Sequence, residues 1–178
     1  FPAGDFERFC LTPEEIVGAY RLLIRQLREV NPKLRIVFTV SPIRHWKDGA
    51  HGNQLSKAVL LLAIDRLVQE FPEVYYFPAY EIVMDELRDY RFYGEDMLHI
   101  SSLAVEYIWE KFKETWISPA IEPLMKRVDK LNKSLAHRPF SPESDAYRMF
   151  QQRLRQEIET LQQMNQSIDF TSVSSSGV

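Results

Sequence analysis

The chain has 178 residues, 45% of them apolar and 26% charged, which is typical of one folded domain with room for a small appendage. Its net charge is −3 and its lysines and arginines form no cluster, which argues against a nucleic-acid partner. No apolar run is long enough to span a bilayer. The single cysteine, Cys10, excludes an internal disulfide and fits a reducing compartment, so the sequence favours the cytoplasm without fixing the compartment.

The first part of the chain predicts a helix, a strand and a second helix. Thr12-Pro13-Glu14-Glu15 is a capping box with proline at the first helical position, and apolar residues follow at helical spacing until Asn31-Pro32. Residues 34–40 (LRIVFTV) are short, β-branched and apolar, as in a strand that is covered on both faces. A loop with Asp-Gly and Gly-Asn turn signals follows over residues 41–53, and the second helix is expected from about Gln54 to Glu70.

The next part predicts a second strand and a third long helix. Residues 74–77 (VYYF) form the strand, residues 80–87 a short helix, and residues 102–116 the long helix. This order of elements is typical of an α/β domain with parallel strands between layers of helices. Two strands are too few for such a sheet to be stable alone. We therefore expect the later half of an α/β domain.

A pair of helices is predicted after Ser118-Pro119. Apolar stripes run over residues 121–135 and 147–161, and Ser141-Pro142-Glu143 is the expected start of the second helix. We expect these stripes to pack together and not to bind a cofactor. The expected organisation is an α/β portion over residues 1–117, a helical extension over residues 118–165 and a disordered polar tail over residues 166–178.

The stretch DELRDYRFYGEDMLHIS, residues 85–101, contains the best candidate for catalytic chemistry. Asp96 and His99 lie three residues apart, a spacing that can bring the carboxylate to the imidazole Nδ1–H and leave Nε2 free. A carboxylate held this way fixes the tautomer of a histidine base and stabilises the imidazolium, and the pKa of histidine suits that role. The alternative is a structural loop whose charged residues pair across it: Glu86, Arg88, Asp89 and Arg91.

Loops that follow the strands point to the same region. Ligands of open α/β sheets bind at the carboxyl ends of the strands, where residues 41–53, the segment after Pro78 and the approach to His99 converge. Arg44, His45 and Trp46 lie in the first of these loops and are candidate substrate contacts. His45 and His51 lack a third ligand at a recognisable spacing, so we predict no metal site, and no cofactor motif is present.

The chain offers no convincing nucleophile for a His–Asp pair. Ser41 follows a strand but precedes a proline and lacks the glycine-flanked turn of a nucleophile elbow. Ser101 and Ser102 have the positions of helix caps, and Cys10 is a lone thiol far from His99 in the sequence. If the protein is a hydrolase, its nucleophile lies outside these residues.

Two strings, IVFTVSPIRHWKDGAHGNQLSKAVLLLAIDRL and YFPAYEIVMDELRDYRFYGEDMLH, resemble the GSCFA family, a branch of the SGNH/GDSL-like hydrolases. The resemblance spans roughly residues 2–117. It implies a flavodoxin-like three-layer α/β/α fold and a serine-hydrolase-type site in which Asp96 and His99 supply the acid and the base. It also implies that the nucleophilic serine comes from a Gly-Ser-Cys-Phe-Ala motif, and this string is absent from the 178 residues.

The resemblance therefore implies the C-terminal portion of a GSCFA-family, SGNH-like serine hydrolase, inactive as an isolated chain. The expected substrate is a small-molecule or glycan ester, such as an acylated carbohydrate or lipid. The alternative is a non-catalytic binding or assembly module that retains the α/β fold. Because two strands leave an unpaired sheet edge and exposed apolar surface, we also expect a partner. This partner is either the missing N-terminal segment or a second copy of the chain.

Overall fold

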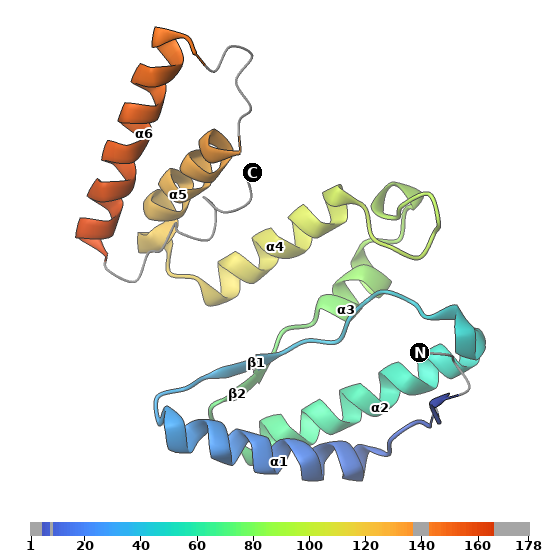
Figure 1. Ribbon diagram of the computed structural model, residues 1–178. Coiled ribbons are helices and arrows are strands. Elements are labelled where there is room, and N and C mark those ends of the chain that lie inside the picture. Colours follow the sequence, from blue (N-terminus) through green and yellow to red (C-terminus); the bar gives the residue numbers. More distant parts are fainter. Residues whose placement is uncertain (1–4, 8, 137–142, 166–178) are drawn as a thin grey trace. The chain divides into compact units, whose positions relative to one another are not determined.

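The computed structural model describes residues 5–7, 9–136 and 143–165, and the chain divides into two compact units, Phe1–Thr115 and Trp116–Val178 (Figure 1). The predicted disordered tail lies outside the described residues. In chain order the elements are α1 (Pro13–Val30), β1 (Ile36–Phe38), η2 (Trp46–Asp48), α2 (Gly49–Glu70), β2 (Val74–Tyr76), α3 (Ala79–Glu81), η3 (Ile82–Glu86), η4 (Tyr90–Phe92), α4 (Ser102–Trp116), η5 (Pro119–Ile121), α5 (Glu122–Leu135) and α6 (Asp145–Met164). None of these helices is long and apolar enough to cross a membrane.

Helix α1 begins at the predicted capping box. The Thr12 hydroxyl accepts a hydrogen bond from the Glu15 N–H at 3.3 Å, and the Glu15 carboxylate accepts one from the Thr12 N–H at 2.7 Å. Two N–H groups that a helix start leaves without partners are thereby satisfied. The helix ends before Asn31, whose N–H bonds to the Leu27 carbonyl. The predicted bounds of this helix are confirmed.

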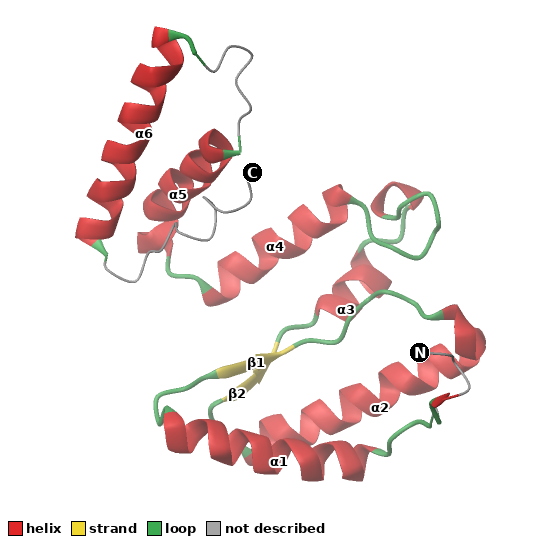
Figure 2. Ribbon diagram, viewed as in Figure 1, coloured by secondary structure: helices red, strands yellow, loops and turns green. Residues whose placement is uncertain are grey.

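Strands β1 and β2 form a parallel pair, with α2 as the connection between them (Figure 2). Ile36 lies opposite Val74 and Phe38 opposite Tyr76. The predicted helix–strand–helix–strand–helix order and the α/β class are confirmed. The strands are shorter than expected, three residues each, and within the described residues no third strand joins the sheet.

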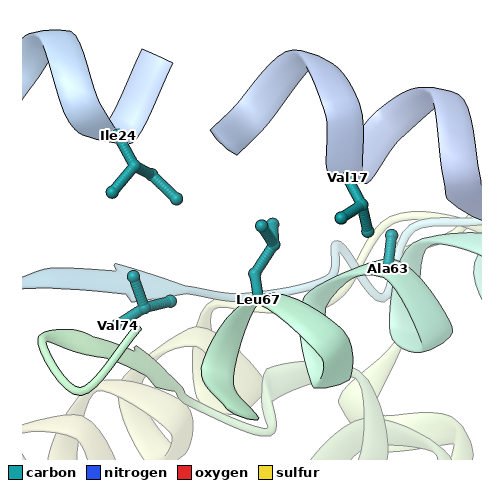
Figure 3. Packing of buried hydrophobic residues seen from close by; sticks show 5 residues of the cluster. All are labelled: Val17, Ile24, Ala63, Leu67 and Val74. Carbon is teal, nitrogen blue, oxygen red and sulfur yellow. The ribbon is translucent and has the colours of Figure 1, made fainter. Parts of the chain in front are cut away.

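The core of the first unit lies between α1, α2 and the sheet. Figure 3 shows Val17 and Ile24 pointing from α1 toward Ala63 and Leu67 of α2, with Val74 of β2 beside them. Each of these side chains is at most 2% exposed. Burial of apolar surface is the main favourable term in folding, so this contact fixes α1 and α2 on one face of the sheet.

Helix α4 approaches the opposite face of the two strands (Figure 1). Phe112 meets Phe77 in an edge-to-face contact with ring centroids 5.1 Å apart. The packing is incomplete, because an apolar pocket of about 390 Å³ lies between the helix and the strands. Its lining comes from the β1 and β2 regions and from α4: Val37, Thr39, Phe77, Ala79, Val105, Ile108, Trp109 and Phe112.

In the second unit α5 and α6 pack as the predicted helical pair. Leu131 and Leu161 are buried at their contact, and Arg127 donates two hydrogen bonds to the Glu157 carboxylate. The predicted start of the second helix was wrong. It begins at Asp145 with Ser144 as its cap, because the Ser144 hydroxyl accepts the Tyr147 N–H at 3.3 Å. Of the expected start, Ser141 and Pro142 lie outside the described residues and Glu143 precedes the helix.

Candidate functional site

The loop over residues 92–101 is closed by backbone hydrogen bonds. The Gly94 N–H donates to the His99 carbonyl at 2.8 Å, and the Ser101 N–H donates to the Phe92 carbonyl at 2.9 Å. An antiparallel bridge joins the two sides of the loop between these bonds. The base of the loop is therefore fixed against the start of α4, and it presents Asp96 and His99 at its tip.

Asp96 and His99 make the contact that their spacing predicts. The Asp96 Oδ2 lies 2.5 Å from the His99 Nδ1. Its Oδ1 accepts the N–H groups of Leu98 and His99, each at 2.9 Å. Between them Met97 has a left-handed backbone with φ of 58°, which a residue other than glycine adopts at a cost of about 1 kcal/mol. This turn lets one carboxylate receive the imidazole and two backbone donors together.

These donors stabilise the ionised form of Asp96. The His99 imidazole is the largest cause and the N–H groups of Leu98 and His99 follow, and together they lower the pKa of the carboxyl to about 2. The His99 side chain is 66% exposed, and its Nε2 has no hydrogen-bond partner among the residues that the structure describes. One imidazole nitrogen is thus anchored while the other is open to solvent.

We expect the Asp96 carboxyl to titrate at about 2, against an ordinary value of 3.8. Because the pKa is lowered on folding, the contribution of the charged contact is complete above about pH 4 and is lost as the pH falls through 2. Carbon NMR of the carboxyl group measures this titration. In His99→Asn the pKa should move back toward 3.8. An unchanged pKa in that variant would show that the backbone donors alone hold the carboxylate.

The predicted loop over residues 41–53 is largely structured. Residues 46–48 form the turn η2, and α2 begins at Gly49, five residues before the predicted start at Gln54. Gly49 has a φ of 70°, which turns the chain from η2 into the helix. The Gly-Asn turn signal was wrong: Asn53 is buried within the helix, and its Oδ1 accepts the His45 N–H at 3.2 Å.

Gly52 lies where η2 folds over the first turn of α2. A Cβ at this position would come within 2.9 Å of the Asp48 Cβ, closer than packed carbon atoms approach. We expect Gly52→Ala to displace η2 and to lower the free energy of unfolding by about 1–3 kcal/mol. Chemical denaturation measures the loss. Gly18→Ala is the matched control, since nothing lies within 4 Å of a Cβ there, and it should not destabilise the protein.

Two of the three predicted substrate contacts line a pocket. Arg44 and Trp46 border a cavity of about 260 Å³ together with three residues from the start of α2: Ala50, Asn53 and Gln54. His45 is not part of this lining, because its Nδ1 lies 2.9 Å from the Asp48 Oδ2. Sequence reasoning missed this second His–carboxylate pair. The signal was present, since the two residues have the same three-residue separation as Asp96 and His99.

Two contacts hold this loop in place. The Arg44 guanidinium lies 3.8 Å from the Met84 sulfur, which connects the segment after β1 with η3, the segment after β2. Lys57 of α2 is 6% exposed and donates to the Ser41 carbonyl at 2.6 Å. Burial lowers the pKa of this ammonium group. The loops after both strands therefore contact each other at the carboxyl end of the sheet.

The charged residues of the central stretch do not pair across the loop, contrary to the structural alternative. Arg91 pairs with Asp89 at 3.2 Å and Arg88 with Asp85 at 3.6 Å, within two or three residues in each case. The Glu86 carboxylate instead accepts the hydroxyl of Tyr107. Exposed local pairs of this kind contribute little to stability, so they do not account for the shape of the loop.

Two serines considered above as nucleophiles, Ser101 and Ser41, have structural contacts. The Ser101 Oγ donates to the Arg91 carbonyl at 2.8 Å and accepts the Ala104 N–H at 3.4 Å, so Ser101 caps α4 as predicted. The Ser41 Oγ accepts the Ile43 N–H in a local turn. Within the described parts of the chain, no group of three or more histidine, cysteine, aspartate or glutamate residues is placed to hold a metal ion.

The sequence of this chain matches two protein-family models. The family model described as GSCFA family matches residues 1–112, which include both strands and the Asp96–His99 loop. The model described as GSCFA domain protein, C-terminal domain, matches residues 128–175, which include most of α5 and all of α6. No curated protein and no solved structure gave a significant match. Since the first match covers more than half of the chain, the protein belongs to the GSCFA family.

Proposed function

We propose that this chain supplies the acid–base pair of a serine-type ester hydrolase, with His99 as the general base and Asp96 as the residue that orients it. The observation that carries the proposal is the anchored Nδ1 of His99 beside an open Nε2. A base needs this arrangement, because the anchored side fixes the tautomer and the free nitrogen accepts the proton.

In the proposed reaction His99 Nε2 takes the proton of a serine hydroxyl as its oxygen attacks the ester carbonyl. The imidazolium then gives that proton to the departing alcohol, and an acyl-serine remains. Water, deprotonated by the same nitrogen, hydrolyses the acyl-serine and restores the serine. Asp96 stays ionised throughout, consistent with its lowered pKa of about 2, and stabilises the imidazolium in both steps.

The resemblance to SGNH-like hydrolases supports a serine from a Gly-Ser-Cys-Phe-Ala motif as the nucleophile. It also supports an ester of an acylated carbohydrate or lipid as the substrate. The 178 residues do not contain this string. The isolated chain is therefore expected to show no ester turnover above background.

A fluorophosphonate probe, which reacts with activated serines, tests the proposal. A protein that carries this chain behind a Gly-Ser-Cys-Phe-Ala segment should be labelled on the serine of that motif. His99→Ala should slow labelling by a factor of about 10² or more, because the serine loses its base. The 178-residue chain alone should remain unlabelled. Equal labelling of wild type and His99→Ala would remove the catalytic assignment.

One observation favours the second candidate, a binding or assembly module. Within the described residues β1 pairs with β2 only, so its other edge presents unpaired N–H and C=O groups. Next to β1, α1 exposes a row of apolar side chains at helical spacing. Tyr20 contacts Phe38 of β1 edge to face, and Leu23, Leu27 and Val30 continue the row.

These surfaces favour coverage by a further strand of the same protein or by a second copy of the chain. An edge strand with apolar side chains on both faces is a template for pairing. The other face of β1 is also apolar and incompletely covered, because an apolar pocket lies between Val37 and α4. Assembly of this kind is compatible with the hydrolase proposal, because it uses the edge of the sheet and not the Asp96–His99 loop.

A further inference from the structure

We infer that the pocket bordered by Arg44 and the start of α2 binds an anionic oxygen group, a carboxylate or a phosphate, of the substrate. The inference deepens the proposed function, since it names a chemical feature of the ester that the site accepts. It rests on four groups around one cavity: the Arg44 guanidinium, the Asn53 amide, the uncapped N–H groups of α2 and the indole of Trp46.

Arg44 has no acidic partner. Among the residues that the structure describes it forms no ion pair, and its one polar contact is with the Met84 sulfur at 3.8 Å. The side chain is only partly exposed. A guanidinium presents a planar set of donors that matches carboxylate and phosphate groups, and hydrogen bonds to such anions are among the strongest in proteins. Arg44 therefore holds its positive charge at the pocket without internal neutralisation.

Asn53 lines the same pocket and carries a neutral amide donor. The residue is 4% exposed, and its Oδ1 is occupied by the His45 N–H. This bond assigns the amide orientation, so the Nδ2 is the donor that Asn53 can offer to a ligand in the pocket that it lines. An anionic oxygen in the pocket would accept its N–H.

The start of α2 adds donors of the same kind. Ala50 lines the pocket within the first turn of this 22-residue helix, where N–H groups lack acceptors inside the helix. The preceding residue, Asp48, makes no side-chain hydrogen bond to them. Its carboxylate contacts the His45 Nδ1 instead. Helix starts with free N–H groups attract anions through these donors and the helix dipole.

The described lining of the pocket is positively charged, because Arg44 is its one charged residue. Lys57, buried beneath the same loop, has only the Ser41 carbonyl as its hydrogen-bond partner in the described structure, so it too lacks a neutralising carboxylate. Asp48 is the nearby acid, and His45 engages it at 2.9 Å. Two unneutralised cations against one engaged carboxylate favour an anionic ligand over a cationic one.

The first test measures binding without catalysis. Acetate and inorganic phosphate are titrated separately into the full protein, and amide NMR signals of Ala50 and Asn53 are followed at constant ionic strength. Saturable shifts with at least one of the two anions are expected. The anion that binds more tightly identifies the substrate group as a carboxylate or a phosphate. Arg44→Gln should weaken that binding about tenfold or more. Arg88→Gln removes an arginine charge that is more exposed and is paired with Asp85 outside the pocket, and it should change nothing.

The absence of saturable shifts with both anions, or equal binding by wild type and Arg44→Gln, would overturn the inference. A second readout compares hydrolysis of a hemisuccinate ester and a neutral acetate ester of the same alcohol. Arg44→Gln should lower the ratio of the two kcat/KM values about tenfold, and an unchanged ratio would contradict the inference. Because the NMR titration needs no turnover, it decides the anion site even if the hydrolase proposal fails.

Discussion

The His99→Ala substitution is expected to lower kcat for ester hydrolysis by about 10²–10⁴-fold, the usual contribution of a positioned general base. The measurement uses the protein that carries this chain together with the nucleophile motif. KM should change little, since the imidazole acts on the proton of the nucleophile and not on the bound ester. Equal kcat values for wild type and variant would exclude His99 from the chemistry.

Asp96→Asn is the companion variant, because it keeps the shape of the side chain and removes its charge. The imidazole loses the anion that fixes its tautomer, so kcat should also fall by about 10² or more. Asp89→Asn is the control, since Asp89 pairs with Arg91 in the same stretch and its substitution should leave kcat unchanged.

The second large effect concerns assembly. The isolated 178-residue chain is expected to sediment as a dimer or larger species at tens of micromolar, not as a monomer of 21.0 kDa. The reason is the apolar row on α1 beside the unpaired edge of β1: Leu23 is 44% exposed, Leu27 41% and Val30 87%. An exposed apolar patch next to a free strand edge favours association.

The double variant Leu23→Glu, Leu27→Glu should return the chain to the monomer, since it places two charges within this row. Leu22→Glu is the matched control. Leu22 is 61% exposed on the same helix, but the helical period places it away from the row, so its substitution should leave the sedimentation unchanged. A compact wild-type monomer that unfolds cooperatively would contradict the assembly proposal.

Features that depend on neighbours in sequence were predictable. The capping box of α1 is a contact between Thr12 and Glu15, and it is present in the structure. The Asp96–His99 hydrogen bond is also local, and its three-residue spacing predicts it without knowledge of the fold. What the spacing does not give is the turn between them. Met97 adopts a left-handed backbone that its residue type disfavours.

Features that depend on tertiary contacts were missed. The sequence Asp-Gly followed by Gly-Asn indicates turns, yet α2 runs through the second pair because the Asn53 side chain is buried against the loop backbone. His45 turns toward Asp48 and therefore does not line the pocket of Arg44 and Trp46. This orientation depends on the same folding of η2 over α2. Local secondary-structure propensity predicts neither the burial of Asn53 nor the folding of this loop over α2.

The most direct test of the proposed acid–base role of His99 is a structure of the protein with a fluorophosphonate bound to its nucleophile. The labelled residue is expected to be the serine of the Gly-Ser-Cys-Phe-Ala motif. His99 Nε2 is expected to lie within about 2.6–3.2 Å of that serine's Oγ or of the adjoining probe oxygen. The contact between His99 Nδ1 and Asp96, 2.5 Å in the free chain, should be kept. A label on another residue, or a His99 imidazole that faces solvent away from the adduct, would contradict the assignment of His99 as the general base.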